Sequence, residues 1–224
     1  NADATDYTNA VVEVTIPYDS DMQSDFDDLR VTDSSGTTTL DFTRETYTAS
    51  TEATLWIQVP SLPGNTRTEV YVYYGNGGVT YSGVGTTTFA VYDDFEDDAN
   101  TEYSGDTSLF DTDTTFAAQG QYGLEATNPN GRATDGMFRT SASGTVSQGE
   151  TIRFMQYVDT TAGSGDETCT LFGVQSPGTA NNNYAVCLEQ FGTDRVSISE
   201  NVDDNDTSGT ILASTTITYT TGWY

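Results

Sequence analysis

The chain of 224 residues contains no Lys and no His, and only two Cys and five Pro. Without His, the chain can build neither a Cys–His zinc site nor a nucleophile activated by His. It has no run of 18 apolar residues, so the sequence offers no candidate membrane span. Residues Asn1-Ala2-Asp3 lack the charged and apolar regions of a signal peptide, and we expect any export signal to lie outside this sequence.

The balance of charge is the most informative feature of the composition. All seven basic residues are Arg, and they face 34 acidic residues, 23 of which are Asp, giving a net charge of -27. Such a charge destabilises a compact state by self-repulsion, unless salt near 1 M shortens the Debye length to roughly 3 Å. The composition therefore indicates a surface adapted to brine, from a halophilic archaeon or one of its viruses. The alternative is an ordinary acidic secreted protein.

The apolar pattern of the first 90 residues predicts short strands. Residues 53–60 alternate, which places Leu55, Ile57 and Val59 on one face and Thr54, Trp56 and Gln58 on the other. Turn residues rich in Gly, Pro and Asn separate the strands at intervals of about 8–12 residues, as in a β-sandwich. The expected strands cover residues 11–16, 25–33, 39–42, 53–60 and 69–76.

Three motifs within this segment carry a resemblance to a known family. They are Met22–Arg30 followed by Thr32-Asp33, then Leu55–Pro63, and then Val72-Tyr73-Tyr74-Gly75-Asn76. In order and spacing they resemble an uncharacterised β-sandwich family that recurs in secreted and surface proteins of archaea and bacteria. The resemblance implies a location and an architecture for residues 1–90, and no activity.

The remaining residues, 91–224, resemble the concanavalin A-like (laminin G-like) jelly rolls. The segment Phe89–Glu96 is similar to the opening strand of those domains, and Gly222-Trp223-Tyr224 is similar to the start of a further core strand. We therefore expect an all-β protein of two antiparallel β-sandwich domains in tandem, the second jelly-roll-like and incomplete at its C-terminus. Between these ends, strands are expected at 121–126, 151–158, 195–200, 210–213 and 216–219.

The two cysteines predict a cross-strand disulfide. Residues 168–174 and 183–189 read as strands separated by a turn-rich segment, and a hairpin centred near Gly178 sets Cys169 directly opposite Cys187. Cβ atoms of such a pair lie about 4.5–5.5 Å apart, close to the distance that a disulfide needs. An extracellular location would permit this bond. The alternative is a pair of reduced cysteines that serve as small apolar residues.

Acidic turns offer candidate sites for a structural calcium ion, which needs six to eight oxygen ligands. The candidate ligands are Asp204, Asp206 and Ser208 in one turn, Asp93, Asp94 and Glu96 in a second, and Asp111 and Asp113 in a third. Asp-rich turns are also what hairpins and salt-adapted surfaces use without any ion. Asn205 opens the N-glycosylation sequon Asn205-Asp206-Thr207, and a glycan there would compete with an ion.

Exposed aromatic residues could instead contact sugars. Tyr184 with Asn181, Asn182 and Asn183 is the candidate glycan contact, and a stripe of Trp56, Tyr71, Tyr73 and Tyr74 is a second idea. Alternating Tyr and Val in a strand also stabilise a sheet through cross-strand pairs, so the stripe is open to that plainer explanation. No pair of carboxylates shows the alternating spacing of glycoside hydrolases, so no catalytic residues are predicted.

Together these features predict a non-catalytic extracellular module. It would serve structure and adhesion in a surface array, a filament, or a virion spike or tail fibre. It would require no cofactor, and a structural calcium ion is the candidate ligand. The expected partners are other copies or domains of the same assembly and glycans or glycosylated cell-surface protein. Nucleic acid and direct membrane insertion are excluded by the acidic surface and the lack of a span. The alternative is a piece of a secreted glycan-active hydrolase whose catalytic residues lie elsewhere.

Overall fold

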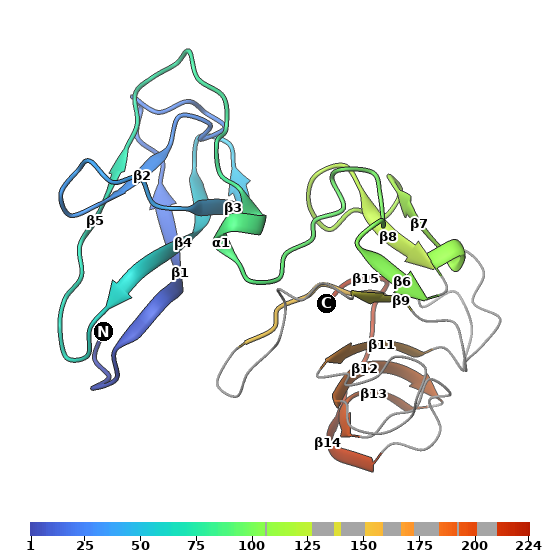
Figure 1. Cartoon of the computed structure of the whole chain (residues 1–224). Helices are drawn as coiled ribbons and strands as arrows, with labels where there is room; N and C mark the ends of the chain where they lie inside the picture. Colours follow the sequence, from blue (N-terminus) through green and yellow to red (C-terminus); the bar gives the residue numbers. More distant parts are fainter. Residues whose placement is uncertain are drawn as a thin grey trace. The chain divides into compact units, whose positions relative to one another are not determined.

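The computed structural model describes residues 1–105, 107–126, 137–139, 151–158, 167–172, 184–191, 193–200 and 210–224 (Figure 1). The chain divides into two compact units, Asn1–Asp93 and Asp94–Tyr224, here called unit 1 and unit 2. Nearly all regular structure in the described residues is antiparallel strand, apart from α1 (Gly85–Thr88) and the single 3₁₀ turn η1 (Thr107–Leu109). The predicted all-β class is confirmed. Among the described residues, no helix has the length and apolar character needed to cross a membrane.

Unit 1 contains two sheets. The first has the order β1-β4-β3, and the second pairs β2 with β5. Every pairing is antiparallel. The register between β1 and β4, the two longest strands of the unit, sets Val12 opposite Ile57 and Val14 opposite Leu55. The strands are β1 (Tyr7–Pro17), β2 (Arg30–Asp33), β3 (Phe42–Thr48), β4 (Glu52–Leu62) and β5 (Val70–Tyr73).

Both sheets of unit 1 contribute to one hydrophobic core, which makes the unit a β-sandwich. The predicted alternation of β4 is confirmed, because Leu55, Ile57 and Val59 are buried while Trp56 and Gln58 are partly exposed. Each fully buried aliphatic side chain stabilises the folded state by about 1.5–3 kcal/mol. Phe42 of β3 adds to this core from the same sheet. The other sheet and the loops complete it with Met22, Phe26, Leu29, Val31, Leu40, Val70 and Val72.

The segment that follows β5 folds back over the first sheet. The backbone N–H of Val84 donates to the carbonyl of Phe42 at 2.8 Å, so this segment covers the free edge of β3. On the outer face of β4, the side-chain amide of Gln58 donates to the carbonyls of Thr87 and Thr88. The opening strand expected over residues 89–96 is absent: Phe89 packs edge-on against Trp56 of the sheet, and Tyr92 stacks on Phe89.

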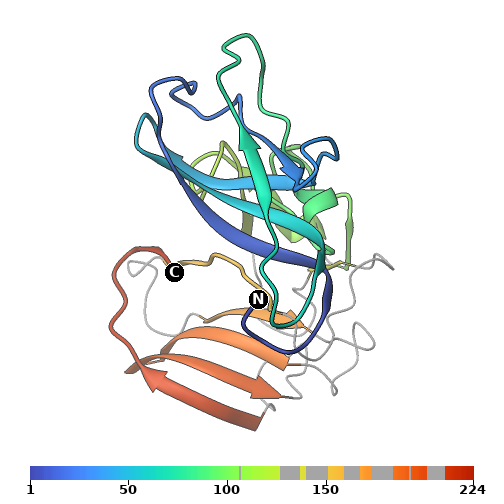
Figure 2. The ribbon, with the colours of Figure 1, turned by 90° about the vertical axis from the view of Figure 1, so that its left-hand side faces the viewer.

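Unit 2 contains a four-stranded antiparallel meander with the order β11-β12-β13-β14, drawn in orange and red in Figure 2. Shorter two-stranded pairs join β6 with β9, β7 with β8, and β10 with β15. The strands are β6 (Tyr103–Gly105), β7 (Phe110–Asp113), β8 (Gly123–Ala126), β9 (Met137–Arg139), β10 (Tyr157–Val158), β11 (Glu167–Phe172), β12 (Tyr184–Phe191), β13 (Thr193–Glu200), β14 (Thr210–Thr216) and β15 (Gly222–Trp223).

Two strand predictions for unit 2 are corrected by the structure. Of residues 151–158, only Tyr157 and Val158 form a strand, since they are the ones that find a partner, in β15. Residues 217–219 do not form a strand, because the chain leaves β14 after Thr216 and tucks the Tyr219 ring against Val158 and Leu188. The concanavalin A-like interpretation of this unit stays a prediction.

Candidate functional site

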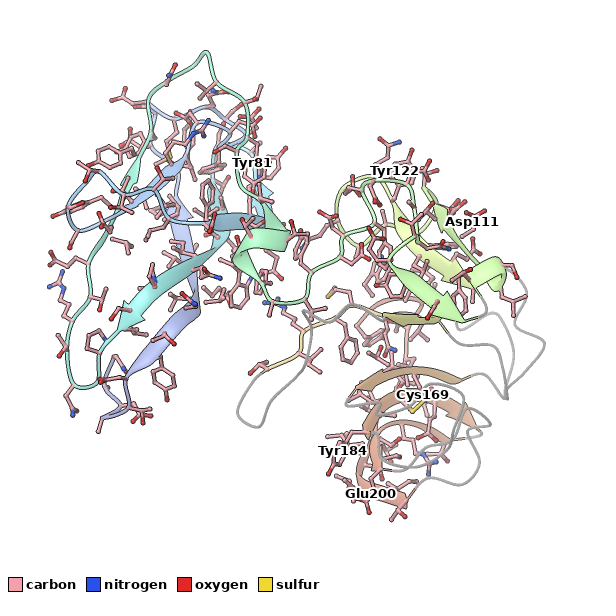
Figure 3. The ribbon with its side chains drawn as sticks, in the orientation of Figure 1. Tyr81, Asp111, Tyr122, Cys169, Tyr184 and Glu200 are labelled. Atoms are coloured by element: carbon pink, nitrogen blue, oxygen red, sulfur yellow. A yellow bond between two sulfur atoms is a disulfide. The ribbon has the colours of Figure 1, made fainter. Side chains whose placement is uncertain are left out.

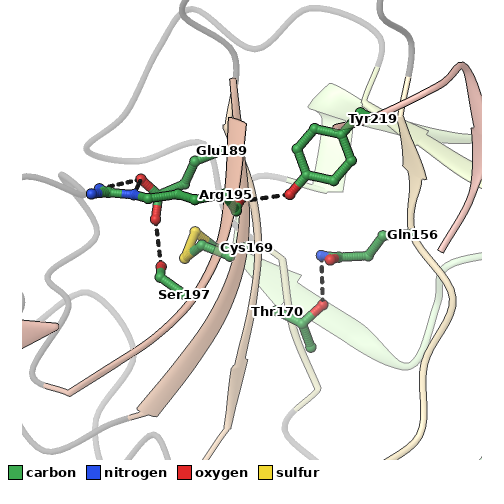
Figure 4. Close-up of a disulfide and its surroundings, with 8 residues drawn as sticks. Gln156, Cys169, Thr170, Glu189, Arg195, Ser197 and Tyr219 are labelled. Atoms are coloured by element: carbon green, nitrogen blue, oxygen red, sulfur yellow. Dashed lines mark hydrogen bonds and ion pairs between the residues drawn. A yellow bond between two sulfur atoms is a disulfide. The ribbon is translucent and has the colours of Figure 1, made fainter. Parts of the chain in front are cut away.

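The disulfide of unit 2 joins β11, an edge strand of the four-stranded sheet, to its neighbour β12 (Figure 4). Cys169 on β11 and Cys187 on β12 are direct register partners with a Cα–Cα distance of 4.1 Å, and their sulfur atoms are bonded. The hairpin symmetry around residue 178 predicted this register, and the predicted disulfide is confirmed. The bond fixes two neighbouring strands to each other at one cross-strand pair.

A buried carboxylate lies on the same face of the sheet, two residues beyond Cys187. The Arg195 Nε atom donates to Glu189 Oε2 at 2.6 Å, and the Ser197 hydroxyl donates to Glu189 Oε1. Glu189 is only 3% exposed, whereas the Arg195 side chain is 40% exposed, so the arginine carries the charge to the surface. A buried carboxylate needs such compensation, because an unpaired charge in this position would cost several kcal/mol. The cluster is therefore a satisfied structural pair.

The opposite face of the sheet is apolar and holds Tyr219. Its hydroxyl donates to the backbone carbonyl of Arg195 at 2.6 Å, and burial raises the pKa of this hydroxyl above its ordinary value. Nearby, the side-chain amide of Gln156 donates to the Thr170 hydroxyl at 3.1 Å. These contacts attach the C-terminal segment to the sheet through backbone and side-chain groups that stay neutral at physiological pH.

One hollow opens over β13 and β14 of this sheet. It has a volume of about 440 Å³ and is lined by Thr193, Arg195, Ser214 and Thr216. The lining offers hydroxyl groups and one guanidinium group that is already paired with Glu189. None of these groups is a nucleophile with a base beside it, so the hollow supports no catalytic assignment.

The second calcium candidate has a structural use in unit 2. The Glu96 carboxylate accepts hydrogen bonds from the backbone N–H groups of Gln121 and Tyr122, both at 2.8 Å. Asp94 accepts from the backbone N–H of Glu96, and Asp93 is half-buried. The described residues contain no group of three or more acidic or Cys ligands that could hold a metal ion. The calcium prediction for Asp93, Asp94 and Glu96 gains no support from this geometry.

The β7–β8 hairpin brings two like charges together. Asp111 lies directly opposite Glu125, so both carboxylates project from the same face of the pair. Asp113 lies two residues further along that face, and a hydrogen bond from the Thr115 hydroxyl lowers the pKa of its carboxyl. Neither of these two strands supplies an Arg as a register partner, so the pair itself holds no cation that offsets the repulsion between Asp111 and Glu125.

Of the remaining predicted site residues, the structure describes Tyr184 alone. The calcium candidates Asp204, Asp206 and Ser208, the sequon residue Asn205, and the glycan candidates Asn181, Asn182 and Asn183 lie outside the described residues. Tyr184 is described: it begins β12, is 46% exposed, and lies opposite Glu200 (Figure 3). Its role in contacting a glycan stays a prediction.

In unit 1, a buried acid connects two loops that are far apart in sequence. Asp28 is 2% exposed, and its carboxylate accepts from the backbone N–H groups of Gln23 at 3.1 Å and Gly75 at 2.6 Å. The Gln23 side-chain amide donates in turn to the carbonyls of Asn76 and Val79. These hydrogen bonds join the first sequence motif, which contains Gln23 and Asp28, to the third, which contains Gly75 and Asn76. They explain why an acid and an amide occur in the first motif.

Comparison with known families gives a match over this region. Residues 25–107 match the model of DUF2341, a domain of unknown function. The matched range contains Asp28, the strands β2 to β5 and the covering segment, and it extends beyond the end of unit 1. No curated protein and no solved structure matches the chain.

Two arginines of this matched region are fully engaged, and sequence reasoning missed both. Arg44 lies between the rings of Tyr47 and Tyr81, at 4.4 and 4.5 Å from their centroids, and pairs with Asp27 at 3.0 Å. Arg30 donates to three backbone carbonyls. The sequence signal for both was the small number of basic residues: with only seven arginines in the chain, each one is a candidate for a structural role.

The aromatic stripe proposed for Trp56 and the β5 tyrosines does not form. Trp56 lies on β4, where its indole N–H donates to Glu45 and its ring packs edge-on against Phe89. Tyr71 and Tyr73 belong to the other sheet, and with Tyr74 they are 44–49% exposed. The stripe was wrong as a single surface, and what remains is a separate exposed group of three tyrosines.

Proposed function

We propose that this protein is a non-catalytic extracellular module that serves structure and adhesion on the surface of a halophilic archaeon or of its virus. The observation that carries the proposal is the lysine-free acidic composition, with 34 acidic residues against seven arginines. Arg30 and Arg44 are engaged by backbone carbonyls, aromatic rings and one carboxylate of unit 1, so neither is free to pair with the other acidic residues. A surface of this kind suits concentrated salt.

The β7–β8 hairpin supports the same assignment. Directly opposed carboxylates destabilise an antiparallel pair by about 0.2–1 kcal/mol, unless ions screen them. Asp111, which is exposed, and Glu125, which is half-buried, stand in that relation. A protein that folds in dilute solution has reason to avoid this pairing, whereas one that folds in brine does not.

The disulfide supports an oxidising compartment. Bonds of this kind form and persist outside the cell and are rare in the cytosol. Cys169 and Cys187 are the two cysteines of the chain, and both are consumed in the bond. The partners that fit are other copies or domains of a surface array, filament or virion fibre, and glycans or glycosylated protein on a cell.

Two measurements test the proposal. Circular dichroism during stepwise dilution should show loss of cooperative unfolding below about 0.5 M salt, and unchanged stability in dilute buffer would contradict salt adaptation. Incubation of the full chain with halophilic cells or their isolated surface glycans should show binding without turnover. Release of reducing sugar by the pure protein would instead support the second candidate, a glycan-active hydrolase.

A further inference from the structure

The tyrosines of unit 1 fall into two groups. Five of them make contacts within the unit: Tyr7 donates to Asp3, Tyr18 packs on Phe26, Tyr47 and Tyr81 enclose Arg44, and Tyr92 stacks on Phe89. The other three are Tyr71, Tyr73 and Tyr74, for which the described residues supply neither a hydrogen bond nor a ring contact. All three belong to one strand and the residue after it, and their rings are 44–49% exposed.

Tyr71 and Tyr73 share the outward face of the β2–β5 pair, since Val70 and Val72, which alternate with them along β5, pack against the core. Two positions along a strand separate their attachment points by about 7 Å. The Tyr73 hydroxyl lies 2.9 Å from where a Cβ on Gly36 would be, so the ring extends over the turn at residues 34–37. That turn contains Ser34, Ser35, Gly36 and Thr37, and within it the Ser35 hydroxyl bonds to the Asp33 carboxylate and to the Thr37 hydroxyl.

The charge of this face differs from that of the rest of the chain. The register partners of Tyr73 and Tyr71 on β2 are Arg30 and Thr32, so neither tyrosine has a carboxylate directly opposite it. The acidic group beside them is Asp33, whose carboxylate accepts from the backbone N–H and the hydroxyl of Ser35 in the adjoining turn. The Arg30 guanidinium is satisfied by the carbonyls of Asp27, Leu29 and Thr80, and it is therefore not a free anchor for an anionic ligand. With a net charge of -27 on the whole chain, anionic polymers are repelled.

We propose that Tyr71 and Tyr73 form a stacking platform for a neutral polysaccharide, with the hydroxyl-rich turn beside Tyr73 bonding to the sugar hydroxyls. The assignment deepens the proposed adhesive function and rests on it. Flat aromatic faces without a surrounding cavity suit a chain of repeating rings, because each ring offers an apolar face without requiring a pocket. Rigid tyrosine side chains also lose little conformational entropy when they are covered.

The test uses the full chain and insoluble amylose, cellulose and chitin as probes in about 2 M NaCl, with alginate as the anionic comparison. The wild type should bind at least one of the three neutral polysaccharides. The double variant Tyr71→Ala/Tyr73→Ala should bind that polysaccharide about tenfold to a hundredfold more weakly, since two stacking rings are lost. The double variant to Phe should keep most of the affinity, because the rings remain. Tyr7→Ala is the matched control, since Tyr7 is also exposed, at 42%, but its hydroxyl is held by Asp3.

Each other outcome overturns the platform. Equal binding by the wild type and the double Ala variant would refute it and leave adhesion to another surface. Adhesion to whole cells with no binding to any neutral polysaccharide would refute it while the proposed function stands. Stronger binding to alginate, or a change in self-association as the sole effect of the double variant, would also refute it. Unfolding midpoints of all variants, compared with that of Tyr7→Ala, check that the fold is kept.

Discussion

Replacing Asp28 with Ala tests how far one buried carboxylate holds unit 1 together. The change removes the acceptor for two backbone N–H groups, those of Gln23 and Gly75. At 2% exposure the site leaves little room for water to replace it. A buried donor without a partner costs about 1–3 kcal/mol, so Asp28→Ala should lower the free energy of unfolding by about 2–5 kcal/mol. That is a large part of the roughly 5–15 kcal/mol that a domain has.

The assay is urea unfolding in about 2 M NaCl, because urea leaves the ionic strength unchanged. A Trp223→Phe background leaves Trp56, on β4 of unit 1, as the single tryptophan reporter. Asp28→Asn should fall between the wild type and the Ala variant, since its amide keeps one acceptor oxygen. Asp21→Ala is the matched control: it removes an exposed carboxylate from the same loop. If Asp28→Ala unfolds within about 0.5 kcal/mol of that control, the assigned role of Asp28 is incorrect.

Three further predictions concern unit 2. Glu125→Gln should stabilise the hairpin by about 0.2–1 kcal/mol in dilute salt by removing the repulsion from Asp111, and a gain that persists unchanged in saturated salt would contradict this reason. Reducing the disulfide should lower the free energy of unfolding by about 3 kcal/mol, given the separation of 18 residues, as measured by near-ultraviolet circular dichroism melts. Thiol labelling of the unreduced protein would show that the bond does not exist. Thr115→Val should raise the pKa of Asp113 toward its ordinary value, which NMR titration can measure. In the wild type, the Asp113 carboxylate stabilises the folded state at pH values above its unfolded pKa. That contribution is lost as the pH falls through the lowered pKa of the folded state.

Features with a short repeat were predictable from the sequence. The alternation of residues 53–60 settled which side chains of β4 are buried, because a strand turns its side chains to opposite faces with a period of two. The cysteine pairing was predictable for a related reason: the two strands flank one turn, so a single centre of symmetry fixes the register. In both cases the deciding interactions lie close together in sequence.

Features that depend on distant contacts were not predictable. The bond from Gly75 to Asp28 spans 47 residues, and nothing near either residue in sequence announces the other. The predicted aromatic stripe failed because β5 pairs with β2 and not with the sheet of Trp56, and a local pattern does not specify which strand becomes a neighbour. Glu96 looked like a free ligand for the same reason, since its partners lie 25 and 26 residues further along.

The placement of the arginines also determines where trypsin can reach folded unit 1. Cleavage needs a flexible, accessible arginine, and Arg30 and Arg44 are each held by several internal contacts. Arg67 differs: its side chain is 86% exposed, in the loop between β4 and β5, with a single surface pair to Glu69. Limited digestion should therefore nick the folded unit at one peptide bond, and the two pieces should stay together because each supplies strands to the same core.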